Sequence, residues 1–221
     1  MSVHEIYKWL AASKRHFLVG PPHVWQMKRE FQIRFLRQVG LQPQQYLLDL
    51  GCGTLRGGIP LIQYLEPGHY YGVDVRAQAL DEGKKELREA GLEHKNPVFV
   101  LSEQLSSLNI DREFDFIWAF AVLIHMRDDI LGECLGLVRR HLKEGGCFYA
   151  NVMIGNRFEH RWFRWRGFPI VRRTLAFYEN TGFRNGLSVG DAGQLSSRGH
   201  PLASLFKVDN RMLVFRRGRK C

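Results

Sequence analysis

A short apolar stretch, Tyr46–Leu50, runs directly into the glycine-rich turn Gly51-Cys52-Gly53. Glycine adopts backbone angles that other residues avoid, and its missing side chain lets a ligand lie against bare backbone. Helical spacing of apolar residues follows, from Ile59 to Leu65. A strand, a glycine turn and a helix in this order are typical of ligand sites at the carboxyl edge of a parallel sheet. The segment therefore predicts an α/β protein with a ligand at this edge.

Strand-like and helix-like patterns alternate from residue 46 onward, which is typical of a parallel sheet covered by helices. The last two expected strands are joined without room for a crossover helix, so the last strand can run antiparallel. The sequence predicts an α/β, Rossmann-like fold with a seven-stranded sheet, mostly parallel with an antiparallel last strand, and helices on both faces. The expected strands are 46–50, 70–75, 97–101, 114–120, 147–154, 184–189 and 212–216.

The clearest expected helix follows the fourth strand, because its apolar residues recur at i, i+3, i+4 and i+7. Asp128 or Asp129 can cap its start, and Gly145-Gly146 can stop it. Further helices are expected at 59–65, 77–90 and 170–181, with two more in residues 2–39.

Composition narrows the class of protein. The 221 residues are 45% apolar, enough for one compact domain over residues 1–221. No stretch approaches the roughly 18–20 unbroken apolar residues that span a bilayer, and the charged N-terminus does not resemble a secretory signal. The four cysteines form no CxxC pair, which excludes the usual zinc spacings and favours reduced thiols. We therefore expect a cytoplasmic protein.

An acidic residue, Asp74, follows Gly53 by 21 residues and ends the second expected strand. A carboxylate there can accept hydrogen bonds from both hydroxyls of a ribose. The dinucleotide-binding pattern needs a third glycine at position 56, where this chain has Arg56. S-adenosylmethionine (SAM) has no phosphate, and Asp49 could offset its cationic end. The pattern favours SAM, while the alternative is a plain tight turn with two ordinary strand-end carboxylates.

Four segments in this order resemble motifs of the class I SAM-dependent methyltransferases. They are LLDLGCGTLRGG, YGVDV, FDFIWAFAVLIHM and HLKEGGCFYANV. The resemblance implies a SAM-binding core at 45–155, an N-terminal helical lid or substrate segment at 1–44, and a substrate-side insertion with C-terminal strands at 156–221. The chain departs from the family at Leu55, where many members carry a glycine.

The resemblance also implies a role for each matching residue. Asp49, Gly51 and Gly53 would surround the methionine part of SAM, Asp74 would bind the ribose hydroxyls, and Val75 would pack on the adenine. The remaining cofactor contacts implied are Ser102 and Glu103 near the adenine, and Phe120 and Ala121 beneath the sulfonium.

His125, between the fourth strand and the next helix, is the candidate catalytic residue. Methyl transfer depends mainly on holding acceptor and methyl in line, and a general base helps when the acceptor is a hydroxyl. A histidine with an unperturbed pKa of about 6.5 is mostly neutral at cellular pH and can accept a proton. The alternative is a structural histidine that hydrogen-bonds the helix start or shields the cofactor.

The sequence lacks the motifs that are typical of several other methyl acceptors. The fourth strand does not carry the Asn/Asp-Pro-Pro-Tyr/Phe motif of adenine and cytosine amino methylation, and no Pro-Cys could serve cytosine C5 methylation. Cys134 lies on an apolar helix face, which is typical of a core residue. No acidic cluster suggests a magnesium site, so we expect no metal. The sequence favours O-methylation of a small-molecule or saccharide-like acceptor.

A basic, aromatic segment at 157–173 leaves other acceptors open. Together with the net charge of +10, its arginines and aromatic residues could bind a phosphate and stack on a ring. An anionic small molecule, RNA or an anionic membrane surface would fit. The alternative is an amphipathic segment whose aromatic side chains pack on the sheet and whose arginines face solvent. An RNA methyltransferase and a non-catalytic SAM-binding scaffold are therefore alternative predictions, and the sequence does not predict an oligomeric state.

Overall fold

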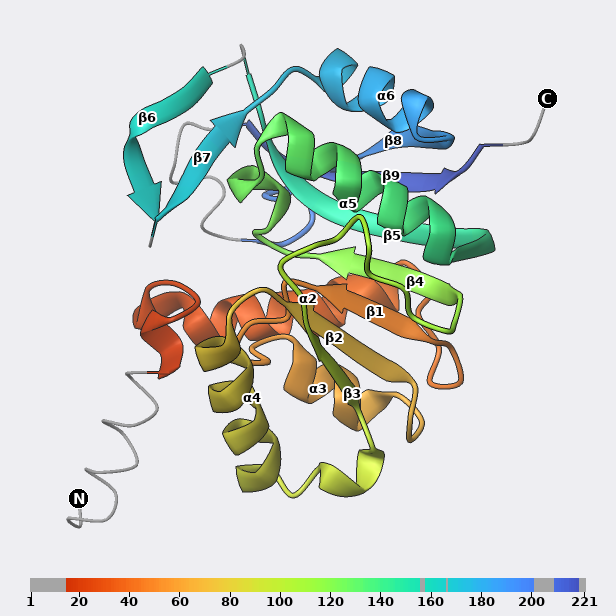
Figure 1. Ribbon diagram of the computed structural model, residues 1–221. Coiled ribbons are helices and arrows are strands. Elements are labelled where there is room, and N and C mark those ends of the chain that lie inside the picture. Colours follow the sequence, from red (N-terminus) through yellow and green to blue (C-terminus); the bar gives the residue numbers. More distant parts are fainter. Residues whose placement is uncertain (1–14, 156–157, 166, 201–208, 219–221) are drawn as a thin grey trace. The chain divides into compact units, whose positions relative to one another are not determined.

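The computed structural model (Figure 1) describes residues 15–155, 158–165, 167–200 and 209–218, and only the backbone of 158–165. The chain divides into two compact units. We call Met1–Gln44 with Gly51–Leu101 the first unit, and Gln45–Leu50 with Ser102–Cys221 the second unit. The predicted division into 1–44, 45–155 and 156–221 is a functional one and stays a prediction.

Seven strands form one sheet in the order β3-β2-β1-β4-β5-β9-β8. The pairs β2–β3, β1–β4 and β4–β5 are parallel, whereas β9 is antiparallel to both β5 and β8. The predicted seven-stranded α/β sheet with an antiparallel last strand is therefore confirmed. Its strands are β1 (Leu47–Leu50), β2 (Tyr70–Asp74), β3 (Val98–Leu101), β4 (Phe114–Ala119), β5 (Leu142–Ile154), β8 (Leu187–Gln194) and β9 (Asp209–Arg217).

The helices of the first unit bury the apolar residues that predicted them. Ile59, Leu61 and Ile62 of the helix after the glycine turn are at most 4% exposed. The helix after β2 ends where expected, because Gly91 takes φ +67° and its N–H donates to the carbonyl of Arg88. The helical elements are η1 (Pro22–Val24), α2 (Trp25–Gln38), α3 (Gly58–Tyr64), α4 (Ala77–Glu89) and η2 (Glu93–Lys95).

The second unit carries η3 (Leu123–His125), α5 (Asp128–His141) and α6 (Leu175–Arg184). Figure 1 shows α5 alongside β5 and α6 beside β8. The apolar face of α5, including Cys134, is fully buried as predicted. Burial raises the pKa of the Cys134 thiol to about 12, so this cysteine is an unreactive core residue.

The predicted ends of α5 were wrong. Arg127 is the N-cap residue and makes no side-chain cap, while Asp128 and Asp129 lie in the first helical turn, where their charges favour the helix dipole. The helix ends at His141, and Gly145-Gly146 lies within β5. There the β4–β5 pairing shifts register, and Gly145 takes φ +80°. The glycine pair therefore forms an irregularity in a strand instead of stopping a helix.

The expected helix at 170–181 was also partly wrong. Residues Phe168–Arg172 form β7, which pairs with β6 (Phe158–Trp165) in a separate two-stranded sheet. The helix α6 begins only at Leu175, because the Thr174 hydroxyl accepts a hydrogen bond from the Phe177 N–H and caps it. The strand expected at 184–189 lies at 187–194.

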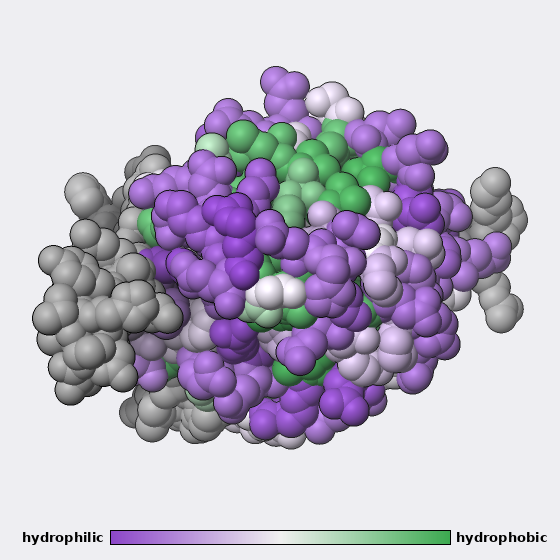
Figure 2. All heavy atoms as spheres, turned by 90° about the horizontal axis from the view of Figure 1, so that it is seen from below, coloured by the Kyte–Doolittle hydropathy of each residue, from purple (hydrophilic) through white to green (hydrophobic). Residues whose placement is uncertain are grey.

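Among the described residues, no helix is both long enough and apolar enough to cross a membrane. Figure 2 shows hydrophilic residues over much of the face in view, with hydrophobic side chains reaching the surface in places between them. Large hydrophobic side chains that are at least about one-third exposed include Val75, Val98 and Leu101 of the first unit and Phe183 of the second.

Candidate functional site

The glycine turn and Asp74 meet in the first unit. Gly51 and Gly53 take φ +72° and +57°, a backbone conformation that favours glycine. The Gly51 N–H donates to the carbonyl of Val73 over 2.7 Å, and the Gly53 N–H donates to Asp74 Oδ2 over 2.8 Å. The structure thus brings together three residues that the sequence assigned to one site.

A leucine supports the glycine turn where many family members carry a glycine. Leu55 takes φ +59° and is fully buried. Its side chain fills space left by two other glycines, because a Cβ would lie 2.8 Å from Leu55 Cδ2 at Gly58 and 2.9 Å from Leu55 Cγ at Gly83. The turn therefore keeps the left-handed conformation, and burial of leucine, worth about 1.5–3 kcal/mol, offsets a backbone cost of about 1–2 kcal/mol.

An arginine that the sequence analysis missed orients Asp74. The backbone N–H of Arg76 donates to Asp74 Oδ1 over 2.9 Å, and its Nε lies 3.3 Å from the same oxygen. Asp74 is only 4% exposed. Each of its carboxylate oxygens accepts a hydrogen bond from a backbone N–H of the first unit. This arrangement fixes the plane of the carboxylate that the sequence predicted to bind a ribose.

Two exposed apolar side chains adjoin Asp74. Val75 follows it directly, and Leu101 is the Cα partner of Asp74 in the β2–β3 pairing. They are 36% and 53% exposed, respectively; Val75 follows the inner strand β2, and Leu101 ends the edge strand β3. An adenine ring could cover this pair. Val75 was predicted for that role, whereas Leu101 was missed although it immediately precedes the predicted Ser102.

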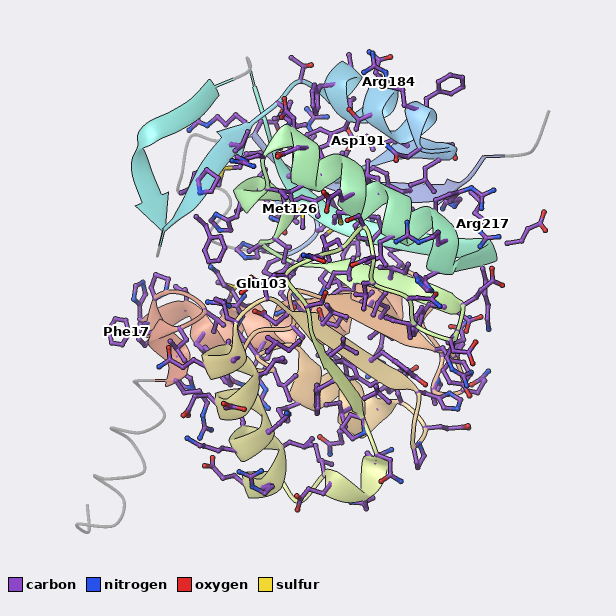
Figure 3. All side chains as sticks on the ribbon, viewed as in Figure 1. Phe17, Glu103, Met126, Arg184, Asp191 and Arg217 are labelled. Carbon is purple, nitrogen blue, oxygen red and sulfur yellow. The ribbon has the colours of Figure 1, made fainter. Side chains whose placement is uncertain are left out.

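Five of the predicted cofactor residues belong to the second unit. Ser102 is half-exposed, and its hydroxyl donates to the carbonyl of Gln104 over 3.1 Å. Glu103, labelled in Figure 3, is exposed. Asp49 in β1 is 4% exposed and pairs with Trp118 of β4, whose ring stacks on Phe120 at 5.7 Å. Their predicted SAM contacts stay predictions.

Ala121, the fifth of these residues, has a strained backbone after β4. Its φ of +60° is rare for a residue other than glycine. Its N–H donates to Asn151 Oδ1 over 2.6 Å, and the Asn151 amide nitrogen donates to Asn210 Oδ1 over 3.2 Å. Asn151 of β5 was not predicted. It holds the loop after β4 in place from the neighbouring strand.

The contact of His125 determines which ring nitrogen carries a proton. Its Nδ1 lies 2.8 Å from the backbone carbonyl oxygen of Pro169 in β7. A carbonyl oxygen only accepts hydrogen bonds, so Nδ1 must be the donor. In the neutral ring the lone pair is then on Nε2. This tautomer suits a general base that works through Nε2.

A buried arginine supports the turn that follows His125. Arg173 is fully buried, its Nε donates to Asp128 Oδ1 over 2.9 Å, and its Nη2 donates to the carbonyl of Met126 over 2.6 Å. Met126 is labelled in Figure 3. This arginine belongs to the basic, aromatic segment 157–173, but it is inside the fold and not on a binding surface. The side chains of 156–166 lie outside the described residues.

Within the described part of the chain, no group of three His, Cys, Asp or Glu side chains could hold a metal ion. The expectation of a metal-free site stays a prediction. The described groups suit a different ligand: a turn with two positive-φ glycines, a fixed carboxylate, and an exposed apolar pair beside it. These are the features that the predicted methyl donor would need.

Comparisons with known proteins give matches to methyltransferases. Residues 48–148 match a family model described as a methyltransferase domain. The chain is 27% identical over 126 residues to the probable methyltransferase ltbC of Aspergillus luteorubrus, covering 55% of this chain and 44% of that protein. It is 27% identical over 149 residues to cycloartenol-C-24-methyltransferase of Arabidopsis thaliana, covering 67% and 40%. The chain therefore matches less than half the length of these two relatives.

Solved structures show the same fold. Magnesium protoporphyrin IX methyltransferase from Synechocystis PCC 6803 with bound SAH has a TM-score of 0.65 at 17% identity, covering 98% of this chain and 95% of that one. The glycopeptide N-methyltransferase MtfA with sinefungin has a TM-score of 0.65 at 13% identity, covering 86% and 93%. The chain thus contains a segment similar to a methyltransferase domain and shares its fold with solved methyltransferases.

Proposed function

We propose that this protein transfers the methyl group of SAM to an oxygen atom of a small-molecule or saccharide-like acceptor. The observation that carries the cofactor part is the Gly53–Asp74 hydrogen bond, which ties the glycine turn to a fixed carboxylate. Asp74 would accept the ribose hydroxyls, and Val75 with Leu101 would pack on the adenine. When bound, SAM supplies an activated methyl group on a sulfonium sulfur.

The tautomer of His125 supports transfer to oxygen. A hydroxyl acceptor must lose its proton as the new bond forms, and the Nε2 lone pair of His125 could take it. The hydrogen bond from Nδ1 to Pro169 would stabilise the resulting imidazolium, because the donor becomes more strongly polarised. An acceptor amine would need such a base less if it arrived unprotonated.

The acceptor class is the part of the proposal that needs a direct test. Extracts separated into RNA, protein, lipid and small-molecule fractions would be incubated with methyl-labelled SAM and the protein. We expect label in the small-molecule fraction. The Asp74→Ala variant is the control for cofactor binding, and Phe183→Ser, on an 82% exposed position of α6, controls for the substitution itself.

Each other outcome points to one alternative. Label in RNA would support the RNA methyltransferase that uses segment 157–173, and label in lipid would support an acceptor at an anionic membrane surface. SAM binding without label in any fraction would support a non-catalytic scaffold. The cytoplasmic location stays a prediction.

A further inference from the structure

Two hydrogen bonds join the turn at His125 to the segment around β7. The ring of His125 donates from Nδ1 to the carbonyl of Pro169 over 2.8 Å. The carbonyl of the next residue, Met126, accepts a hydrogen bond from Arg173 Nη2 over 2.6 Å. Pro169 lies near the start of β7, and Arg173 lies just after its end. Because the two bonds are four residues apart on this segment, they fix the orientation of the turn as well as its position.

The backbone of Arg173 is held by β5, the strand that pairs with β4. Its N–H donates to the carbonyl of Met153, and the N–H of Gly155 donates to its carbonyl, both over 3.2 Å. Arg173 also forms an isolated parallel bridge with Ile154. The guanidinium therefore reaches Met126 from a point that is fixed by the seven-stranded sheet.

The side chain of Arg173 connects the turn to α5. It is fully buried, and its Nε donates to Asp128 Oδ1 over 2.9 Å in the first turn of the helix. The ring centres of Phe177 and Tyr178 lie 5.3 and 5.9 Å from its guanidinium carbon. A planar guanidinium can donate to two acceptors in a fixed geometry, which the single ammonium group of lysine does not reproduce. Bridging Met126 and Asp128 in this way therefore requires an arginine.

Stability alone does not explain this buried charge. Taking a charge out of water is costly even when it is paired, and apolar residues often replace buried ion pairs without loss of stability. Within the described part of the chain, Arg173 Nη1 is also buried and makes no hydrogen bond. An apolar side chain could not supply the bond to the Met126 carbonyl, next to His125.

We propose that Arg173 is a positioning residue for His125. By holding Met126, it keeps the imidazole against the Pro169 carbonyl, and so keeps the proton on Nδ1 and the lone pair on Nε2. The hydrogen bonds of the two ring nitrogens set the tautomer of a neutral histidine, so a looser turn would let the proton reside on Nε2 in part of the molecules. Those molecules could not take a proton through Nε2. This inference rests on the proposed function, because it takes His125 as the general base.

The first test reads the tautomer by nitrogen NMR of the histidine side chains in the full chain. His125→Ala assigns the signals of this ring, and measurement at about pH 8.5, about two units above the ordinary histidine pKa, favours the neutral ring. We expect a protonated Nδ1 in the wild type and a mixture of both tautomers in Arg173→Met. Arg140→Met is the matched control and should keep the wild-type tautomer, because Arg140 Nη2 also donates to backbone carbonyls, those of Leu105 and Ser106, over 3.1 Å.

The second test separates positioning from general support of the fold. Turnover is measured on the acceptor fraction that gains label, and SAM affinity is measured by calorimetry. Misplacing a catalytic group by about 1 Å can lower the rate about 10²-fold. Arg173→Met should therefore lower turnover by about that factor and leave the SAM dissociation constant unchanged. In a His125→Ala background the same substitution should cause no further loss, because Arg173 acts through His125.

A second variant covers the case in which Arg173→Met does not fold. Arg173→Lys keeps a buried positive charge beside Asp128 but does not bridge to Met126, so it should shift the tautomer in the same direction. An unchanged tautomer in the variants that fold would overturn the positioning role and leave the proposed function intact. A further loss of turnover in the His125→Ala background would also overturn it, because Arg173 would then act on more than His125. Normal turnover in His125→Ala would overturn the proposed base and the positioning role together.

Discussion

The glycine turn of the first unit and the loop after β4 in the second unit each contain one residue other than glycine with φ near +60°. In the first unit it is Leu55, which is fully buried against Gly58 and Gly83. In the second unit it is Ala121, half-buried, whose N–H bonds to Asn151. One backbone is stabilised by packing and the other by a hydrogen bond. Substitution by glycine is therefore expected to change stability in opposite directions at these two positions.

The two regions also differ in what we expect them to do. The region around the glycine turn offers a fixed carboxylate and apolar surface, which suit binding of the cofactor. The region around His125 offers a ring nitrogen with a lone pair, which suits proton transfer. Variants of the first should alter affinity for SAM, and variants of the second should alter turnover.

The largest effect is expected at His125. Loss of a general base lowers turnover by about 10²- to 10⁴-fold, so His125→Ala should do so on the acceptor fraction that gains label. The SAM dissociation constant, measured by calorimetry, should not change. His94→Ala is the matched control, because its Nδ1 also lies 2.9 Å from a backbone carbonyl, that of Gly91, at an exposed site. Normal turnover in His125→Ala would remove it from the chemistry.

At Leu55, we expect a large loss of stability and no gain from restoring glycine. Leu55→Ala should lower the free energy of unfolding by about 2–5 kcal/mol, because it empties a buried site while the left-handed backbone stays. Leu55→Gly should relieve the backbone but keep most of that loss. Equilibrium unfolding in urea measures both. If Leu55→Gly were as stable as the wild type, packing would not be what stabilises this turn.

The stability of the protein should also depend on pH, through Glu86 of the first unit. Burial raises the pKa of this α4 carboxyl from its ordinary value of 4.5 to about 7, although the nearby Arg29 and Arg15 pull it down. A raised pKa favours the protonated form in the folded state. Its contribution to stability is complete below pH 4.5 and is lost as pH rises through 7.

Unfolding in urea between pH 5 and 8.5 would test this. We expect stability to fall with rising pH by up to about 3 kcal/mol, and Glu86→Gln, which stays neutral, should flatten the curve. The exposed Glu93→Gln is the matched control. An unchanged slope in Glu86→Gln would place the pH dependence elsewhere.

A smaller effect is expected at Asp74, mainly on the affinity for SAM. Asp74→Ala should weaken SAM binding by about 1–3 kcal/mol, since hydrogen bonds to a charged acceptor are worth that much. Turnover at saturating SAM should change less than affinity. The exposed Asp81→Ala on α4 is the control. Equal affinity of Asp74→Ala and wild type would remove Asp74 from the cofactor site.

Local sequence patterns could be predicted from the sequence, whereas contacts with backbone groups could not. Gly53 and Asp74 were predicted together because strand periodicity and glycine placement are local patterns. The contacts of Arg173 with Met126, of Ala121 with Asn151 and of His125 with Pro169 were missed. In each, one partner is a backbone group, and every residue has one. Residue type therefore carries little signal for such contacts.

Misassigned elements have a related cause. Residues 168–181 contain two apolar stretches, Phe168–Val171 and Leu175–Tyr178, each short enough to fit either a strand or a helix. The cap at Thr174 separates them, and the pairing of β7 with β6 decides the first part. Likewise, Gly145-Gly146 signals an irregular backbone, but only the neighbouring strand β4 makes it a strand irregularity and not a helix end.

The smallest effect is expected at Ala121, and it is the sharpest test of the comparison. Ala121→Gly removes the Cβ that makes φ +60° unfavourable, which is worth about 1–2 kcal/mol, and the added freedom of the unfolded chain takes back about 0.4–1 kcal/mol. The hydrogen bond to Asn151 is kept, because it uses the backbone N–H. We expect a net gain of about 0.5–1 kcal/mol by equilibrium unfolding, opposite in sign to Leu55→Gly. A loss at both positions would mean that the methyl group of Ala121 stabilises its loop by packing, and that the two regions offset their strain in the same way.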